Sequence, residues 1–184
     1  DFFNPMRRMI LEKEPNDGHR TIAGLEDEFD VTIITQNGDD FHERAGSTKV
    51  IHLHGEALKN ASTLHPYESY EIDRNNPDIH IGDKARDGSQ IRPYVIYFNE
   101  DIEQRLWKAS VEATKQADVF IVVGSTMLVY PAAELLKMIP PKCELYIIDP
   151  SEVTLSEGCT KEYIHIQSGA SRGLEQLKAI LKLK

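Results

Sequence analysis

The sequence predicts an α/β fold, a doubly wound and mostly parallel Rossmann-like sheet that carries a small inserted module. Three observations predict it: short apolar runs without polar alternation, helical patterns between those runs, and one long polar stretch that interrupts them. Continuous apolar strands are typical of sheets covered on both faces, and alternation of strands with helices indicates parallel order. The length of 184 residues suffices for one large domain or for one domain with a smaller module.

The chain opens on two helical patterns, residues 2–13 and 17–28, with no strand before them. We expect strands at residues 31–35, 50–53, 94–98, 119–123, 145–148 and 163–166, and further helices at 102–116, 131–139 and 172–183. The polar stretch from residue 59 to 90 is long for a structureless loop, so it predicts a small module. The expected domain organisation is therefore a first part of the Rossmann-like domain at 1–58, an insert at 59–91 and a second part at 92–184.

Composition and charge exclude several classes of protein. The chain has 21 Lys and Arg against 30 Asp and Glu, a net charge of −9, and an acidic surface disfavours binding to nucleic acid and to anionic membranes. No apolar run approaches the roughly 20 residues of a membrane span, and the first residues lack the pattern of a signal peptide. We expect a cytoplasmic protein without nucleic acid or membrane partners. The two cysteines, Cys143 and Cys159, cannot form a four-thiolate zinc site.

The densest polar cluster follows the first expected strand and contains Gln36, Asn37 and Asp39. Ligands of open parallel sheets bind beyond the carboxyl ends of the strands, where this cluster lies. Its amides and carboxylate could bind a sugar or a carboxamide. Alternatively, Asn37 and Asp39 only cap a short helix at residues 40–44.

A histidine ends the second expected strand, where His54 is followed by Gly55. An imidazole at this edge of the sheet can act as a general base near neutral pH. His52 shares its face of the strand but lies deeper in the sheet, so we assign it a structural role.

A third polar group follows the strand at residues 119–123 and consists of Gly124, Ser125 and Thr126. Glycine permits close backbone approach, and hydroxyls with backbone amides suit a phosphate or a ribose, although ordinary helix capping explains them equally well. Asp149 closes the strand at 145–148 and either accepts a bond from a ribose hydroxyl or begins the turn at Pro150.

These segments together resemble the sirtuin (Sir2) family of NAD-dependent protein deacylases, over almost the whole chain. They are TQNGDDFHERAG at residues 35–46, VIHLHG at 50–55, RPYVIYFNE at 92–100, GST at 124–126 and VYPAA at 129–133. Pro15, Asn16 and His19 also match the family's entry to the first segment.

The resemblance implies an activity, with NAD as the cofactor and an acyl-lysine protein or peptide as the substrate. In sirtuins the acyl-lysine carbonyl oxygen attacks the anomeric carbon of the nicotinamide ribose, nicotinamide leaves, and the acyl group passes to ADP-ribose. The residue matching His54 deprotonates a ribose hydroxyl, which makes His54 and Asn37 the expected catalytic residues.

The resemblance also implies binding residues. Gln36, Asn37 and Asp39 would hold the ribose and carboxamide of NAD. Further cofactor contacts would come from Gly124, Ser125, Thr126 and Asp149, the last at a position usually occupied by Asn. The segment containing Val95, Phe98, Asn99 and Glu100 would pair with the substrate peptide as an added strand.

The chain departs from the family pattern in four respects. No cysteine lies between residues 59 and 90, so we expect no structural zinc and no metal site. Gly38 replaces an apolar residue against nicotinamide, and Asn99 replaces a glycine of the peptide-pairing segment. The opening strand with its Gly-Ala-Gly turn, and the Asp-Phe-Arg segment after it, have no counterpart, so we expect that an amino-terminal portion is missing.

Two other functions stay open on the sequence. Hydrolysis of NAD or ADP-ribosyl transfer would use the same Asn37 and His54 with water or another nucleophile as acceptor. A non-catalytic module that binds NAD or ADP-ribose is favoured by Gly38, Asn99 and the absent zinc cysteines. The joint presence of Asn37, Asp39 and His54 argues against that module, because a binding protein needs no base.

Overall fold

The computed structural model describes residues 2–125, 132–153, 155 and 161–182. The chain forms two compact units, each built from two stretches of sequence. The first unit comprises Asp1–Pro15 and Ile33–Trp107, and the second comprises Asn16–Thr32 and Lys108–Lys184. Helix α4 (Gln104–Gln116) begins in the first unit and continues into the second.

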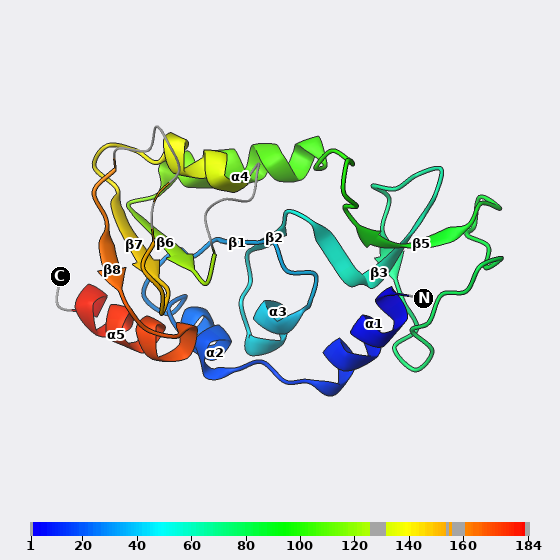
Figure 1. The fold of residues 1–184 in the computed structure, drawn as a ribbon, viewed down its shortest axis with the longest axis horizontal. Helices are drawn as coiled ribbons and strands as arrows, with labels where there is room; N and C mark the ends of the chain where they lie inside the picture. Colours follow the sequence, from blue (N-terminus) through cyan, green and yellow to red (C-terminus); the bar gives the residue numbers. More distant parts are fainter. Residues whose placement is uncertain (1, 126–131, 154, 156–160, 183–184) are drawn as a thin grey trace. The chain divides into compact units, whose positions relative to one another are not determined.

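The second unit contains a parallel sheet with the order β6-β7-β8, as the continuous apolar runs predict (Figure 1). Its elements are β6 (Val119–Val123), η1 (Ala132–Met138), β7 (Glu144–Ile148), β8 (Ile164–Ile166) and α5 (Ala170–Lys182). Successive side chains of β7 enter two different cores. Leu145 and Ile147 pack with Leu136 of η1, whereas Tyr146 and Ile148 pack with residues of α5. Burial on both faces explains why β7 shows no polar alternation.

Helix α2 (Asp17–Ala23) packs against α5 in the second unit (Figure 1). It begins at Asn16, whose side chain accepts a hydrogen bond from the His19 backbone at 3.2 Å, while the His19 ring accepts from the Asn16 backbone. The Gly18 backbone donates to Ser171 Oγ of α5 at 3.1 Å. The sequence predicts that this helix reaches residue 28, but it ends at Ala23 and is followed by turns.

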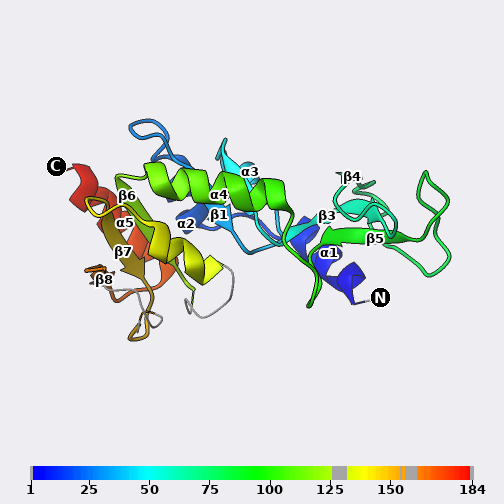
Figure 2. The same ribbon diagram turned by 90° about the horizontal axis from the view of Figure 1, so that it is seen from above.

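The first unit contains a parallel pair of strands and a separate antiparallel sheet (Figures 1 and 2). Its elements are α1 (Phe3–Glu12), β1 (Ile33–Thr35), α3 (Phe41–Ala45), β2 (Val50–His52), β3 (Gly55–Ser62), β4 (Tyr70–Glu71) and β5 (Ile91–Val95). Strands β1 and β2 are the expected parallel pair. The antiparallel order β4-β3-β5 was not expected, and the expected boundary between residues 58 and 59 falls within β3.

Helix α1 packs on β3 and also anchors the loop at residues 77–79. Ile10 packs with Ala57 and Leu58, which are buried on β3. Arg7 is fully buried and donates hydrogen bonds to the backbone carbonyls of Pro77 at 2.8 Å and Lys59 at 2.9 Å, and to Asn60 Oδ1 at 2.8 Å. Asn4 exchanges two hydrogen bonds with the Ile79 backbone. Side chains of α1 thus connect strand β3 with the loop at residues 77–79.

We expect the insert to stay folded without a metal ion. Within the described residues no three His, Cys, Asp or Glu side chains come together as a metal site. Chelation with EDTA or 1,10-phenanthroline should leave the melting temperature of the full-length protein unchanged to within about 1 °C, because hydrogen bonds and packing hold the insert. Elemental analysis of the purified protein checks this expectation directly. Stoichiometric zinc bound within residues 59–91 would contradict it.

No described helix is long and apolar enough to span a membrane. Where a helix was expected at 131–139, the structure has the 3₁₀ helix η1 at Ala132–Met138.

Candidate functional site

The loop after β1 is fixed by hydrogen bonds of its backbone. The Asn37 N–H donates to Thr35 Oγ1 at 3.1 Å, and the Gly38 carbonyl accepts from the Ala57 backbone of β3 at 2.7 Å. Asp39 Oδ1 accepts from the Phe41 N–H at 3.2 Å and closes a turn before α3, whose N-cap residue Asp40 makes no side-chain cap hydrogen bond. Asn37 does not take part in this turn bond, and its residue is exposed. Neither Asn37 nor Asp39 is therefore the N-cap of α3, and the Asn37 carboxamide is available for a ligand.

His54 lies immediately after β2 and beside the same loop. Its backbone carbonyl accepts from the Ile96 N–H at 3.0 Å, which connects it to the chain that follows β5. Burial lowers the pKa of His54 below its usual value of 6.5, although a hydrogen bond to the Gln36 backbone opposes this shift. At neutral pH the imidazole is therefore uncharged and can accept a proton.

Gln36 supplies a buried donor without a partner. Its Nε2 atom is shielded from solvent and forms no hydrogen bond within the described part of the chain. A buried amide donor in this state costs free energy unless a ligand or water accepts from it. Gln36 directly follows β1 and precedes Asn37, so this donor belongs to the same loop as the Asn37 carboxamide.

The chain after β5 makes a tight turn, which corrects the strand expected at 94–98. Strand β5 ends at Val95, and Arg92 fixes the following turn by donating to both carboxylate oxygens of Glu100, at 2.6 and 2.7 Å. Asn99 adopts a φ of 70°, the left-handed region that glycine prefers and asparagine tolerates best among other residues. The backbone conformation at residue 99 is therefore one that either glycine or asparagine can adopt. Phe98 is fully exposed at the tip of the turn.

The remaining candidate residues lie in the second unit. Gly124, with a φ of 58°, follows β6 and donates its N–H to the Ile148 carbonyl at 3.0 Å, so it lies beside Asp149 at the carboxyl end of β7. Asp149 Oδ1 accepts from the Ser151 N–H at 2.8 Å and so begins the turn at Pro150. Ser125 follows Gly124 directly, whereas Thr126 lies outside the described residues.

The candidate residues therefore form two groups. The first unit brings together Gln36, Asn37, Asp39 and His54 with the turn that follows Val95, and the second unit places Gly124 and Ser125 next to Asp149. The sequence did not reveal two further pairs: Glu43 with His52, and Arg92 with Glu100. The first pair joins α3 to β2. It becomes evident only from the structure, in which these two elements lie against each other.

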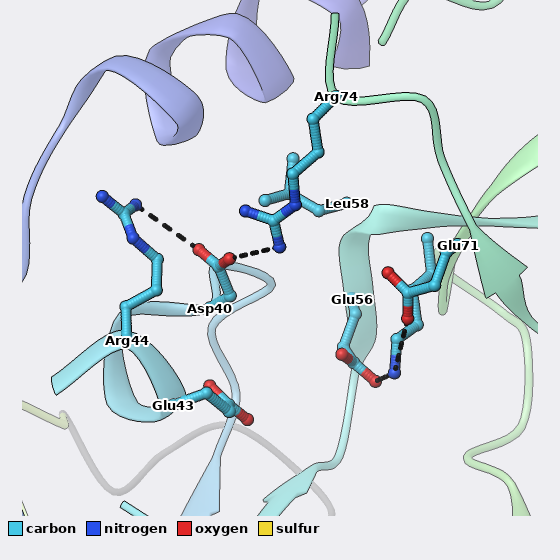
Figure 3. A pocket seen from close by; sticks show the side chains of 8 residues that line it. Asp40, Glu43, Arg44, Glu56, Leu58, Glu71 and Arg74 are labelled. Carbon is cyan, nitrogen blue, oxygen red and sulfur yellow. Dashed lines mark hydrogen bonds and ion pairs between the residues drawn. The ribbon is translucent and has the colours of Figure 1, made fainter. Parts of the chain in front are cut away.

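A charged pocket of about 320 Å³ lies next to this site in the first unit (Figure 3). Glu43 is one of the residues that line it. The other carboxylates have cationic partners within the pocket: Asp40 with Arg44 and Arg74, and both Glu56 and Glu71 with Lys59. Glu43 instead forms an ion pair with His52, at 2.8 Å between Oε1 and Nε2.

Comparisons with known proteins give one consistent result. A family model described as the Sir2 family matches residues 1–131. An NAD-dependent protein deacylase of Bacteroides thetaiotaomicron is 42% identical over 185 residues, which cover 98% of this chain and 77% of that protein. A protein of the same name from Helicobacter pylori is 42% identical over 150 residues, 82% of this chain and 63% of that protein.

Solved structures agree. A mutant Sir2 homologue in complex with ADP-ribose has a TM-score of 0.84 and 29% identity, covering 100% of this chain and 74% of that one. A Sir2 homologue in complex with NAD has a TM-score of 0.82 and 31% identity, covering 95% of this chain and 67% of that one. The family match over most of the chain, together with these relatives, shows that the chain belongs to the Sir2 family.

Proposed function

We propose that the protein is an NAD-dependent protein-lysine deacylase that transfers the acyl group of a lysine side chain to ADP-ribose and releases nicotinamide. The observation that carries the proposal is the position of His54, which is partly buried, hydrogen-bonds to the Gln36 backbone and lies beside the loop that presents Asn37. Relatives named NAD-dependent protein deacylase and a related structure named Sir2 bound to acetylated peptide support it.

The residues of the first unit have separable roles in this proposal. Bound NAD would supply an electrophilic ribose carbon and a nicotinamide leaving group. The Gln36 Nε2 donor and the Asn37 carboxamide would bind and orient the nicotinamide ribose, which lowers the entropic part of the barrier. His54 would accept the proton of a ribose hydroxyl, and its lowered pKa keeps it able to do so at neutral pH.

The substrate peptide would bind as an extended segment alongside β5. That strand is the outer member of the order β4-β3-β5, so it has an edge on which a peptide can add a strand. Val95 is the last residue of β5, and Phe98, Asn99 and Glu100 belong to the turn beyond it. In this arrangement the Arg92–Glu100 ion pair would hold the turn next to the acyl-lysine.

In the second unit, Gly124, Ser125, Thr126 and Asp149 would bind the phosphates and adenosine ribose of NAD. The backbone at Gly124 and the carboxyl end of β7 lie side by side, as such a site requires. The turn formed by Asp149 leaves its second carboxylate oxygen to accept from a ribose hydroxyl.

Incubation of the full-length protein with NAD and an acyl-lysine peptide tests the proposal by mass spectrometry. We expect deacylated peptide together with acyl-ADP-ribose in equal amounts. ADP-ribose without deacylated peptide would instead support NAD hydrolysis or ADP-ribosyl transfer. Unchanged NAD and peptide would refute both catalytic functions and leave a binding module.

A further inference from the structure

Both ring nitrogens of His52 face acceptors. The residue lies on β2 and is only 5% exposed. Its Nδ1 is 3.1 Å from the Asn37 carbonyl oxygen, and its Nε2 is 2.8 Å from Glu43 Oε1. A neutral imidazole has one N–H and one lone pair, whereas the imidazolium has two N–H groups. Because a carbonyl and a carboxylate can only accept, both contacts form together only when His52 is doubly protonated.

The surroundings of the pair favour this charge state. Burial alone would raise the pKa of Glu43, but its hydrogen bond with His52 lowers it below the usual value, and its side chain is 40% exposed. Burial likewise acts to lower the pKa of His52, yet the hydrogen bond with Glu43 raises it above the usual 6.5. Among the described residues, Glu43 of α3, Glu56 of β3 and the carbonyl of Asn37 act on His52, and each of them favours a cation.

We propose that His52 is an imidazolium held between Glu43 and the Asn37 carbonyl, and that it is the positioning residue for Asn37. The inference rests on the proposed function, in which the Asn37 carboxamide orients the reacting ribose. Thr35, the register partner of His52 in the β1–β2 pair, accepts from the Asn37 N–H, so both backbone polar groups of Asn37 are held. A fixed backbone leaves only the side-chain torsions of Asn37 to be ordered when the ribose binds.

The ion pair between Glu43 and His52 makes the position of Asn37 depend on pH. When His52 loses a proton, the remaining N–H stays at Nε2 because the Glu43 carboxylate is the stronger acceptor. The lone pair of Nδ1 then faces the Asn37 carbonyl oxygen, and the attraction becomes repulsion. Since the pKa of His52 is raised, the hydrogen bond from Nδ1 to the Asn37 carbonyl is complete below pH 6.5. It is lost as the pH rises through the folded-state pKa of His52.

Histidine NMR titration of the full-length protein measures this charge state without any turnover. We expect a midpoint for His52 above 6.5 in the wild type and a lower midpoint in Glu43→Gln, whose amide cannot stabilise the cation as a carboxylate does. Glu71→Gln is the matched control, because Glu71 lines the same pocket and pairs with Lys59 instead. It should leave the midpoint unchanged. A wild-type midpoint at or below 6.5 would overturn the inference.

Steady-state kinetics then test the positioning role. At the wild-type pH optimum, Glu43→Gln should lower kcat about tenfold, as a small displacement of Asn37 would. The alkaline limb of its kcat profile should also move to lower pH, in step with the NMR midpoint. Unchanged kcat and pH profile in Glu43→Gln, with deacylation intact in the wild type, would refute the positioning role and leave the proposed function standing. A wild type that holds an imidazolium but deacylates nothing would refute the proposed function instead.

Discussion

The His54→Ala variant of the full-length protein is expected to deacylate an acyl-lysine peptide roughly 10²- to 10⁴-fold more slowly than the wild type. The substitution removes the proposed general base, while the groups proposed to bind NAD stay in place. The dissociation constant for NAD should therefore change little. Deacylation assays and NAD titration of the same preparation check both expectations.

Thermal stability separates this catalytic role from a packing role. His54 is only partly buried, so its loss should leave the melting temperature close to that of the wild type. His65→Ala is a suitable control, because His65 also belongs to the first unit and its side chain is 56% exposed. It should match the wild type in activity and stability. Near-normal deacylation by stably folded His54→Ala protein would exclude the proposed base and favour a binding module.

The pH dependence of the wild type gives a second view of the same group. A general base acts when neutral, so kcat/KM should fall as the pH falls through the pKa of His54. Because burial lowers that pKa, the acid limb should lie below the usual 6.5 for histidine.

Asn37→Ala differs from His54→Ala in that it should weaken NAD binding as well as turnover, since the amide would bind the ribose.

The sequence predicted the second unit well because its sheet is buried on both faces. Residues of β6 and β7 are apolar at nearly every position, and the structure places them between two cores. Strand β3 was missed for the opposite reason. Its residues 55–62 mix small, apolar and charged side chains, and they form a strand because β5 pairs with one edge and α1 covers Ala57 and Leu58.

In the candidate site, likewise, the residues that follow strands could be predicted from the sequence, whereas a contact between two separate elements could not. Asn37 and His54 follow strands, so their place at one edge of the sheet could be read from strand ends and glycines. The link between Glu43 and His52 could not be read in this way. It joins residues nine positions apart through the meeting of α3 and β2, and two charged or titratable residues in a sequence give no sign that they touch.

The Arg7→Met variant is expected to lose about 3 kcal/mol or more of unfolding free energy. Methionine fills much of the same volume but leaves the carbonyls of Pro77 and Lys59 and the Asn60 side chain without their donor. Burial lowers the pKa of Arg7 to about 10, so the wild-type side chain is still charged at neutral pH and its hydrogen bonds are charge-assisted. Urea unfolding of the full-length protein measures the loss, and limited proteolysis should show new cleavage within residues 63–90.

Arg8→Met is the matched control for this prediction, because Arg8 is the adjacent residue of α1 and its side chain, which pairs with Asp78, is 50% exposed. An exposed ion pair contributes no more than about 1 kcal/mol, so Arg8→Met should unfold almost as the wild type does. Arg7→Lys should fall between the two, since a single ammonium keeps the charge but cannot reach three acceptors in the geometry of the guanidinium. If Arg7→Met were as stable as Arg8→Met, the buried guanidinium would contribute nothing beyond its volume. The Asn4 side chain and the β3–β5 pairing would then be what holds the loop at residues 77–79 and strand β3 in place.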